Sequence, residues 1–269
     1  MPDTSEYRST KNTQAPFHTV QFKASHNSYE MREHIGTQLR FNSADPARYG
    51  CRQIEFDLHQ DAGGFEWSVK HRSGDADADL TQFLSELLRW SDDRSRHDVI
   101  VVMLDLKRVD DDIAHFPDNW DAYLRRSFDA GRLALPVEVR VGNLVMWPRL
   151  VDLRDKFIFC LSGDEEHKSE YARQLDRLCF ADRALGPAAI HRADFPSDPR
   201  IFVNFNGGHW KHRTQGPVLP PGYVSRVCGI DNERQWRLFA SMSFNALATD
   251  NVRSSWGEFD SLQAFSGIG

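Results

Sequence analysis

Eight short runs of apolar and β-branched residues recur along this chain of 269 residues, and they constrain its fold more than any other feature. Runs of this kind, bounded by polar turn residues, predict β-strands. They lie at 19–25 (TVQFKAS), 52–59 (RQIEFDLH), 98–107 (DVIVVMLDLK), 143–147 (NLVMW), 156–162 (KFIFCLS), 177–182 (RLCFAD), 200–206 (RIFVNFN) and 245–251 (NALATDN).

Three segments between these runs carry apolar residues at the period of a helix. They are 80–90 (LTQFLSELLRW), 119–131 (NWDAYLRRSFDAG) and 231–244 (DNERQWRLFASMSF), and each places its large apolar side chains on one face. Gly131 is predicted to end the second helix as its C-cap, and Asn232 to begin the third as its N-cap.

Strands that alternate with helices predict a parallel sheet. Eight such units in about 250 residues are typical of a (β/α)8 barrel, here a distorted TIM barrel. We therefore expect an α/β protein with a single domain over 1–269 and a flexible N-terminal segment at 1–16. A doubly wound open sheet is the alternative, but no Gly-x-Gly-x-x-Gly follows any of the strands.

Composition narrows the class of function. The net charge of -6 argues against nucleic-acid binding, which normally needs a basic stripe, and against general attraction to anionic membranes. No segment has the roughly 18 apolar residues that span a bilayer, and the polar start MPDTSEYRST shows no signal peptide. Localisation stays open between the cell interior, non-classical export, and secretion with the leader removed.

The four cysteines, Cys51, Cys160, Cys179 and Cys228, show no metal-type spacing. We expect structural thiols, because two of them sit in apolar, strand-like runs. One disulfide is the alternative if the protein is exported.

Polar side chains gather where the predicted strands end, which is where catalytic groups of a parallel barrel lie. An extended arm after the second strand adds a further histidine. The residues concerned are His26 and Asn27, Glu55 and Asp57, His71, Asp105 and Lys107, and Asp250 and Asn251.

The acidic residues among them predict a metal site. Glu55 and Asp57 are two apart on one strand, so both side chains point to the same face. Two such carboxylates repel each other unless a cation lies between them. With Asp105 and the Asn27 amide they form an all-oxygen set, which suits Ca²⁺ or Mg²⁺ better than zinc.

Two histidines beside a metal are what acid–base chemistry on a phosphodiester uses. One takes a proton from the attacking oxygen, and the other donates a proton to the leaving oxygen. Taken singly, each residue has an ordinary role, such as a turn Asn, a solvated Glu-x-Asp pair or a surface His. The combination in this order along barrel strands favours catalysis.

The motifs SHNSY (25–29), CRQIEFDLHQD (51–61), VKHR (69–72) and VIVVMLDLK (99–107) resemble phosphatidylinositol-specific phospholipase C, above all its calcium-dependent bacterial branch. The resemblance continues through LVMWPRLVDLRDKFIFCLSG (144–163) to NALATDN (245–251), so it covers nearly the whole chain. It implies a phospholipase C that cleaves phosphatidylinositol into diacylglycerol and inositol 1,2-cyclic phosphate.

The resemblance also implies roles for single residues. His26 looks like the base that activates the inositol 2-hydroxyl, and His71 like the acid that protonates the leaving glycerol oxygen. Asn27, Glu55, Asp57 and Asp105 look like ligands of Ca²⁺. Asp105 stands where the family often has a Glu. The metal-independent bacterial branch has an arginine in place of the Glu-x-Asp pair, so that pair favours the calcium-dependent type.

Two relatives and one non-enzyme remain as alternatives. Asp105-x-Lys107, with ATDN and Trp256 near the end, is similar to the sphingomyelinase D-like phospholipases, which use magnesium. Glycerophosphodiester phosphodiesterases are the other relative, although Ser25-His26-Asn27 replaces their His-Arg-Gly opening. A barrel that only binds headgroups would have no need of both an acid and a base.

Further residues are expected to contact the substrate, a phospholipid at a membrane or micelle surface. These are Lys107, Arg72, Asp250 and Trp210, the last from the Gly-rich, basic loop NGGHWKHR (206–213). We expect a monomer that binds no nucleic acid. The acidic run DADAD (75–79) imitates an EF-hand loop but has Leu80 where such a loop needs Gly, so we expect it to cap the following helix.

Overall fold

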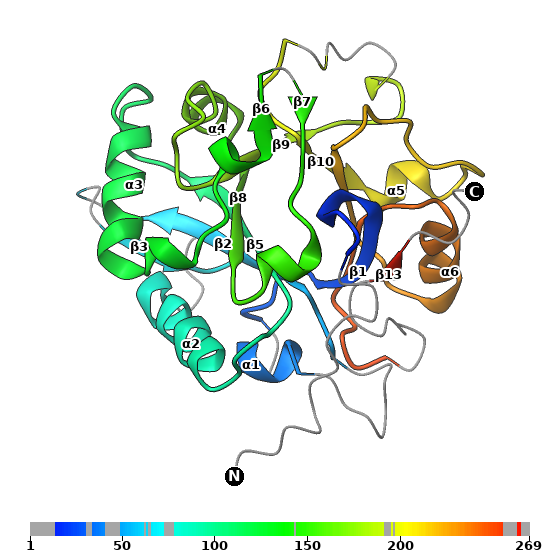
Figure 1. Cartoon of the computed structure of the whole chain (residues 1–269), viewed down its shortest axis with the longest axis horizontal. Coiled ribbons are helices and arrows are strands. Elements are labelled where there is room, and N and C mark those ends of the chain that lie inside the picture. Colours follow the sequence, from blue (N-terminus) through cyan, green and yellow to red (C-terminus); the bar gives the residue numbers. More distant parts are fainter. Residues whose placement is uncertain are drawn as a thin grey trace.

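The computed structural model describes residues 14–30, 34–40, 49–61, 63, 66–72, 78–142, 144–190, 195, 197–254 and 263–264. The centre of this described part is a closed barrel of eight parallel strands (Figure 1). The strands are β1 (Val20–Ser25), β2 (Gln53–Gln60), β5 (Ile100–Arg108), β8 (Phe157–Gly163), β9 (Phe180–Ala184), β10 (Phe202–Asn206), β11 (Val224–Cys228) and β12 (Ala246–Thr249). The sheet closes because β1 pairs with both β12 and β2.

Helices surround the barrel, as Figure 1 shows. They are α1 (Ile35–Gln38), α2 (Leu80–Asp92), α3 (Phe116–Ser127), α4 (Glu165–Tyr171), α5 (Gly207–Trp210) and α6 (Glu233–Ser241). Short 3-10 turns lie at η2 (Phe17–Thr19), η3 (Ala130–Arg132), η4 (Pro136–Val139) and η5 (Leu150–Leu153).

Three short strands extend the barrel sheet, and two more form a separate hairpin. β3 (Trp67–Val69) pairs antiparallel with the second half of β2, and β4 (Ala78–Asp79) pairs with β3. β13 (Gln263–Ala264) pairs antiparallel with β1. The hairpin of β6 (Arg140–Val141) and β7 (Leu144–Val145) lies between α3 and β8 in the chain.

On six of the eight barrel strands the side chains alternate between two hydrophobic clusters, whereas β1 and β2 each have one apolar and one polar face. On β5, Val102 and Leu104 point outward and pack in the cluster that includes Trp120 and Tyr171 from the helices. Val101 and Met103 belong to a second cluster, which fills the barrel interior together with residues such as Phe22. A third cluster lies outside β10, β11 and β12, under α5 and α6. The apolar interior thus ends just below the polar strand ends.

The sparsest strand pairing of the barrel is the seam between β1 and β2, followed by β8–β9 and β11–β12 with two register pairs each. β1 and β2 share a single register pair, Ala24 with Gln53, whereas β2 and β5 pair along seven positions. Beyond the end of β1, the turn residue Ser28 continues the contact. Its backbone N–H donates to the Glu55 carbonyl (3.1 Å), and its Oγ accepts from the Glu55 N–H (2.9 Å).

The structure confirms the predicted barrel, and it corrects the strand list at one place. Seven of the eight predicted runs contain barrel strands. The run 143–147 was wrong as a barrel strand: residues 144–145 belong to the β6–β7 hairpin, and Trp147 packs in the interior cluster. The missing barrel strand is β11, whose residues Val224–Cys228 follow the Pro/Gly-rich segment TQGPVLPPGY (214–223).

The predicted helices also form, with one correction. Asn232 caps α6 by accepting from the Gln235 N–H, as expected. The helix α3 ends at Ser127, so Gly131 is not its C-cap and lies in a 3-10 turn instead. Of the acidic run, Asp79 caps α2 by accepting from the Thr81 N–H, while Asp75 and Asp77 lie outside the described residues.

All four cysteines are free thiols, three of them buried, which confirms the structural interpretation. None of the described helices has the length and apolar character that crossing a bilayer requires. Of the expected N-terminal segment, residues 1–13 lie outside the described residues. Ala15 and Phe17 form backbone hydrogen bonds with Leu150 and Pro148.

Trp210 is part of the outer core. Only 3% of its surface is exposed, and its ring packs edge-on against Phe205 and Phe244. We expect Trp210→Ala to lower the free energy of unfolding by about 3–5 kcal/mol, because it removes a large buried side chain. Urea denaturation measures the loss. Val218→Ala, at a side chain that is 86% exposed, is the control and is expected to change stability by less than about 0.5 kcal/mol. A Trp210→Ala variant as stable as the control would contradict the core placement.

Candidate active site

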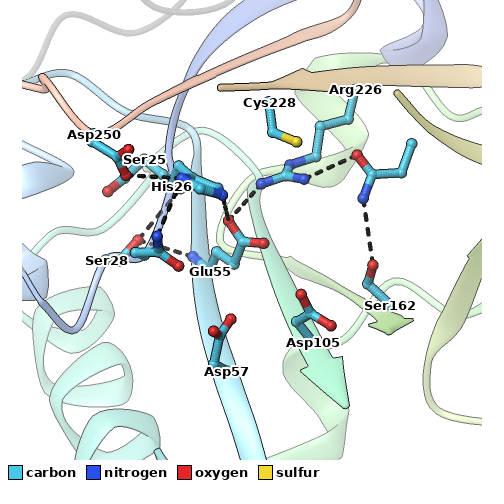
Figure 2. Close-up of polar contacts among 12 residues, drawn as sticks. Ser25, His26, Ser28, Glu55, Asp57, Asp105, Ser162, Arg226, Cys228 and Asp250 are labelled. Atoms are coloured by element: carbon cyan, nitrogen blue, oxygen red, sulfur yellow. Dashed lines mark hydrogen bonds and ion pairs between the residues drawn. The ribbon is translucent and has the colours of Figure 1, made fainter. Parts of the chain in front are cut away.

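The polar ends of the barrel strands meet in one ring above the apolar interior. Figure 2 shows Glu55 between His26 and Arg226, with Asp57 and Asp105 beside it. These five side chains lie at the ends of different strands, except that Glu55 and Asp57 share β2. Because closure of the sheet brings all these ends together, side chains far apart in sequence become neighbours.

His26 follows the last residue of β1 and is held by contacts of both its backbone and its ring. Its backbone N–H donates to the Thr249 carbonyl at the end of β12 (3.0 Å). Its Nδ1 lies 2.8 Å from Asp250 Oδ1, and its Nε2 lies 3.9 Å from Glu55 Oε2. Burial and the nearby charge of Arg226 lower the pKa of His26, but the hydrogen bond with Asp250 and the charges of Glu55 and Asp250 outweigh them, so the pKa is raised.

Glu55 and Arg226 form a buried ion pair across the barrel. Arg226 Nη2 donates to Glu55 Oε2 (2.5 Å), and both side chains are about 4% exposed. Burial raises the pKa of Glu55, while the charges of Arg226 and His26 lower it. A buried carboxylate of this kind depends on its partner, because an unpaired buried charge is strongly unfavourable.

Asp57 and Asp105 face each other from paired positions of β2 and β5. Lys107 Nζ lies 2.7 Å from Asp105 Oδ2 and 3.4 Å from Asp57 Oδ2. The other oxygen of each carboxylate, Oδ1, is buried and has no hydrogen-bond partner among the described residues.

These carboxylates fit a hard divalent cation. One oxygen each from Glu55, Asp57 and Asp105 can be chosen so that all lie within 4.8 Å of one another. A buried carboxylate oxygen without a partner is costly, and a cation bound between two of them would satisfy both. Ca²⁺ and Mg²⁺ both prefer such all-oxygen sites.

Gly163 at the end of β8 is required by the close approach of Asp105. Its φ of +81° lies in the left-handed region, which favours glycine. A Cβ at this position would overlap both Asp105 Oδ1 and the Leu106 carbonyl oxygen. Only glycine therefore leaves the Asp105 carboxylate where it is.

His71 reaches the cluster from outside the barrel, on the segment that follows β3. Its Nδ1 lies 3.1 Å from Asp57 Oδ2 and 3.3 Å from the Tyr29 hydroxyl. Its side chain is 40% exposed, against 25% for His26. Burial and the charge of Asp57 raise the pKa of Tyr29, so its hydroxyl remains protonated.

A chain of polar contacts continues around the other half of the ring. Asn204 accepts from Arg226 Nη1 (2.9 Å) and donates to Ser162 Oγ (3.4 Å), and Ser162 donates to Asp182 (2.7 Å). Asp182 in turn binds the ammonium of Lys168 (2.8 Å), which is 1% exposed. This half of the ring is internally paired.

The sequence-predicted residues do not all lie together. Asp250 contacts His26, and Lys107 contacts the carboxylates. Asn27 has a left-handed φ of +48°, and its Nδ2 lies 3.3 Å from His26 Nδ1. Arg72 is exposed beside His71. Trp210, expected at the substrate, packs instead in the outer core, because Phe205 and Phe244 enclose its ring.

Besides Asn204, Ser162 and Asp182, the ring residue that was not predicted from the sequence is Arg226, the partner of Glu55. It lies on β11, in the segment YVSRVC (223–228), where two β-branched valines flank the polar pair Ser225-Arg226. The valines were the available signal for a strand, and an arginine between them was a signal for an inward-facing charge.

The arrangement can perform general acid–base chemistry beside a cation site. Each histidine has its Nδ1 engaged by a carboxylate, which leaves Nε2 as the atom that exchanges a proton. The three carboxylates supply the negative charge that holds a divalent ion. Such a site suits an anionic substrate that has both an attacking and a leaving oxygen.

No protein-family model matches the chain, and no curated protein does. Solved structures do match. A calcium-dependent phosphoinositol-specific phospholipase C from Pseudomonas sp. shares 21% identity, over 94% of this chain and 96% of that chain, with a TM-score of 0.74. A Ca²⁺-dependent phosphatidylinositol-specific phospholipase C from Streptomyces antibioticus shares 17%, over 93% and 99%, with a TM-score of 0.66.

A glycerophosphodiester phosphodiesterase from Parabacteroides distasonis shares 12% identity, over 90% of this chain and 94% of that chain, with a TM-score of 0.51. At these identities the likeness establishes the fold alone, a TIM barrel, over nearly the whole chain. What the site does has to be inferred from its own residues.

We expect Arg226→Met to lower the free energy of unfolding by about 3–5 kcal/mol, because it leaves the Glu55 carboxylate buried and unpaired. Urea denaturation at neutral pH measures the change. Adding Glu55→Gln to the same chain removes the unpaired charge, so the double variant should recover part of the loss. A double variant no more stable than Arg226→Met alone would show that the ion pair is not the cause.

Proposed function

We propose that this protein is a metal-dependent phosphodiesterase of the phosphatidylinositol-specific phospholipase C type. The observation that carries the proposal is the contact of two histidines with one carboxylate cluster. His26 is 3.9 Å from Glu55, and His71 is 3.1 Å from Asp57. The shared fold of the calcium-dependent phospholipases C supports the same reaction class.

The metal ligands of the proposal are Glu55, Asp57 and Asp105, with the Asn27 amide as a fourth. Ca²⁺ is our first choice and Mg²⁺ the alternative, since both take oxygen ligands. When bound, the ion would stabilise negative charge on the phosphoryl group.

The two histidines divide the proton transfers. His26 Nε2 accepts the proton of the inositol 2-hydroxyl, whose oxygen forms a bond to phosphorus. The bond from phosphorus to the glycerol oxygen breaks, and His71 Nε2 donates a proton to that oxygen. The products are inositol 1,2-cyclic phosphate and diacylglycerol. The attack is intramolecular, so it gains from the orientation of neighbouring groups.

The substrate of the proposal is a phospholipid at a membrane or micelle surface, bound by a monomer. Lys107, which contacts Asp57 and Asp105, and Arg72, the chain neighbour of His71, are the basic side chains that would contact the phosphate. Asp250 orients His26 in this scheme.

A phospholipid panel assayed with and without Ca²⁺ tests the proposal, with phosphorus NMR at early times to identify the product. We expect cyclic inositol phosphate from phosphatidylinositol, and no turnover after exhaustive chelation. His26→Ala and His71→Ala should each slow turnover by roughly 10²–10⁴-fold without loss of the fold. Turnover that survives chelation, or His71→Ala with normal rates, would contradict the assigned roles.

One observation favours a second candidate. Asp105 and Lys107 form the carboxylate–lysine pair that is also similar to sphingomyelinase D-like phospholipases. Such an enzyme would release choline from sphingomyelin or lysophosphatidylcholine. Choline release with phosphatidylinositol untouched would replace the first proposal by the second.

The pH dependence tests the role of His26 separately. His26 acts as a base only when unprotonated, so kcat/KM should rise with pH through its raised pKa. Asp250→Asn removes a negative charge that raises this pKa and weakens the hydrogen bond that also raises it, while Glu55 and Arg226, which also face the ring, stay in place. The rising limb should therefore move to lower pH and the maximal rate should fall. An unmoved limb, or the same shift in a Glu233→Gln surface control, would argue against the assignment.

A further inference from the structure

Lys107 lies on the outward side of the carboxylate cluster. Its ammonium bridges the Oδ2 atoms of Asp57 and Asp105, at 3.4 Å and 2.7 Å. Its side chain is 34% exposed, whereas that of Asp57 is 1% exposed and that of Asp105 16%. The lysine therefore lies where the cluster meets solvent.

The second oxygen of each aspartate points elsewhere. Both Oδ1 atoms are buried and lack a hydrogen-bond partner among the described residues. Each aspartate thus gives one oxygen to the ammonium and keeps a second without a partner, and one oxygen each from Glu55, Asp57 and Asp105 lies within 4.8 Å of the others. The lysine neutralises the cluster only in part.

The two basic side chains of the cluster differ in how firmly they are held. Arg226 is buried, and its guanidinium binds both Glu55 and Asn204. Lys107 has a flexible four-carbon stem, and its ammonium contacts the two aspartates. A divalent ion at the aspartates would repel both positive charges, but only the half-exposed lysine has room to move away.

We propose that Lys107 is a displaceable internal counterion, which a divalent cation drives off the two aspartates toward the mouth of the barrel. There its ammonium is available to the anionic phosphate of the substrate. This rests on the proposed function for the identity of that anion, but not for the competition between lysine and metal. The lysine would weaken metal binding in the free protein and, in return, link metal binding to substrate binding.

Reciprocity follows from this link. If the metal frees Lys107 for the phosphate, then a bound phosphate must strengthen metal binding by the same factor. Removal of the ammonium should therefore have opposite effects on the two ligands. Metal affinity should rise, and metal-dependent affinity for the anion should fall.

Calorimetry of the full chain with Ca²⁺ alone, without substrate, is the first test. We expect Lys107→Met to bind Ca²⁺ about tenfold more tightly than the wild type, because the competing charge is gone. Lys107→Arg keeps the charge and should stay near the wild type. Arg237→Met removes a charge at an exposed position of α6 and should leave Ca²⁺ affinity unchanged.

Titration with inositol 1-phosphate, followed by phosphorus NMR, is the second test. In the wild type, saturating Ca²⁺ should tighten binding of this probe, and in Lys107→Met that gain should be about tenfold smaller. Circular dichroism verifies that each variant is folded.

The outcomes are distinguishable. Lys107→Met that binds Ca²⁺ no more tightly than the wild type would overturn the counterion role, even if the wild type is an active Ca²⁺-dependent phospholipase. Weaker binding would show instead that the lysine holds the aspartates in place. If neither protein binds Ca²⁺ or Mg²⁺, the metal site of the proposed function fails as well.

Discussion

Closure of the sheet is the constraint on which the rest of the structure depends. A closed barrel has no free edge, so the last inward-facing side chain of every strand must share one ring. In this protein the layers below the ring are apolar, and the ring itself is almost entirely polar. The alternation that buries Met103 also presents Asp105 two residues later. The apolar core and the polar candidate site thus arise from the same alternation of inward- and outward-facing side chains, at different levels along the barrel axis.

The alternation of side chains within a single strand could be predicted from the sequence. Seven barrel strands were found because each is a run of apolar residues with a clear end. Glu55, Asp57 and Asp105 were placed together because spacing of two on one strand and equivalent positions on the next fix their direction. His71 was expected on an extended arm, and the arm is β3 with the residues that follow it.

What could not be predicted are the contacts between strands far apart in the chain. Arg226 is separated from Glu55 by 171 positions, and the strand that carries it is short and preceded by a Pro/Gly-rich loop. Because β11 was missed, the run 143–147 was predicted as the eighth barrel strand. An apolar run alone does not reveal whether it joins a barrel or a hairpin. Trp210 looked like a surface anchor for a similar reason. Its neighbours are Phe205 on β10 and Phe244 in the loop before β12, so its burial is a property of the fold.

We expect the seam between β1 and β2 to open before the rest of the barrel on heating. His26, the base of the proposed function, and the carboxylate Glu55 lie on opposite sides of it, and the turn residue Ser28 joins those sides with two hydrogen bonds. Where backbone pairing is sparse, local opening requires less free energy than global unfolding. Warming should then separate the two halves of the site while the other seven strand-to-strand contacts hold. Loss of activity would then occur at a lower temperature than unfolding of the barrel. It would be reversible, because the intact barrel holds β1 and β2 close enough to pair again.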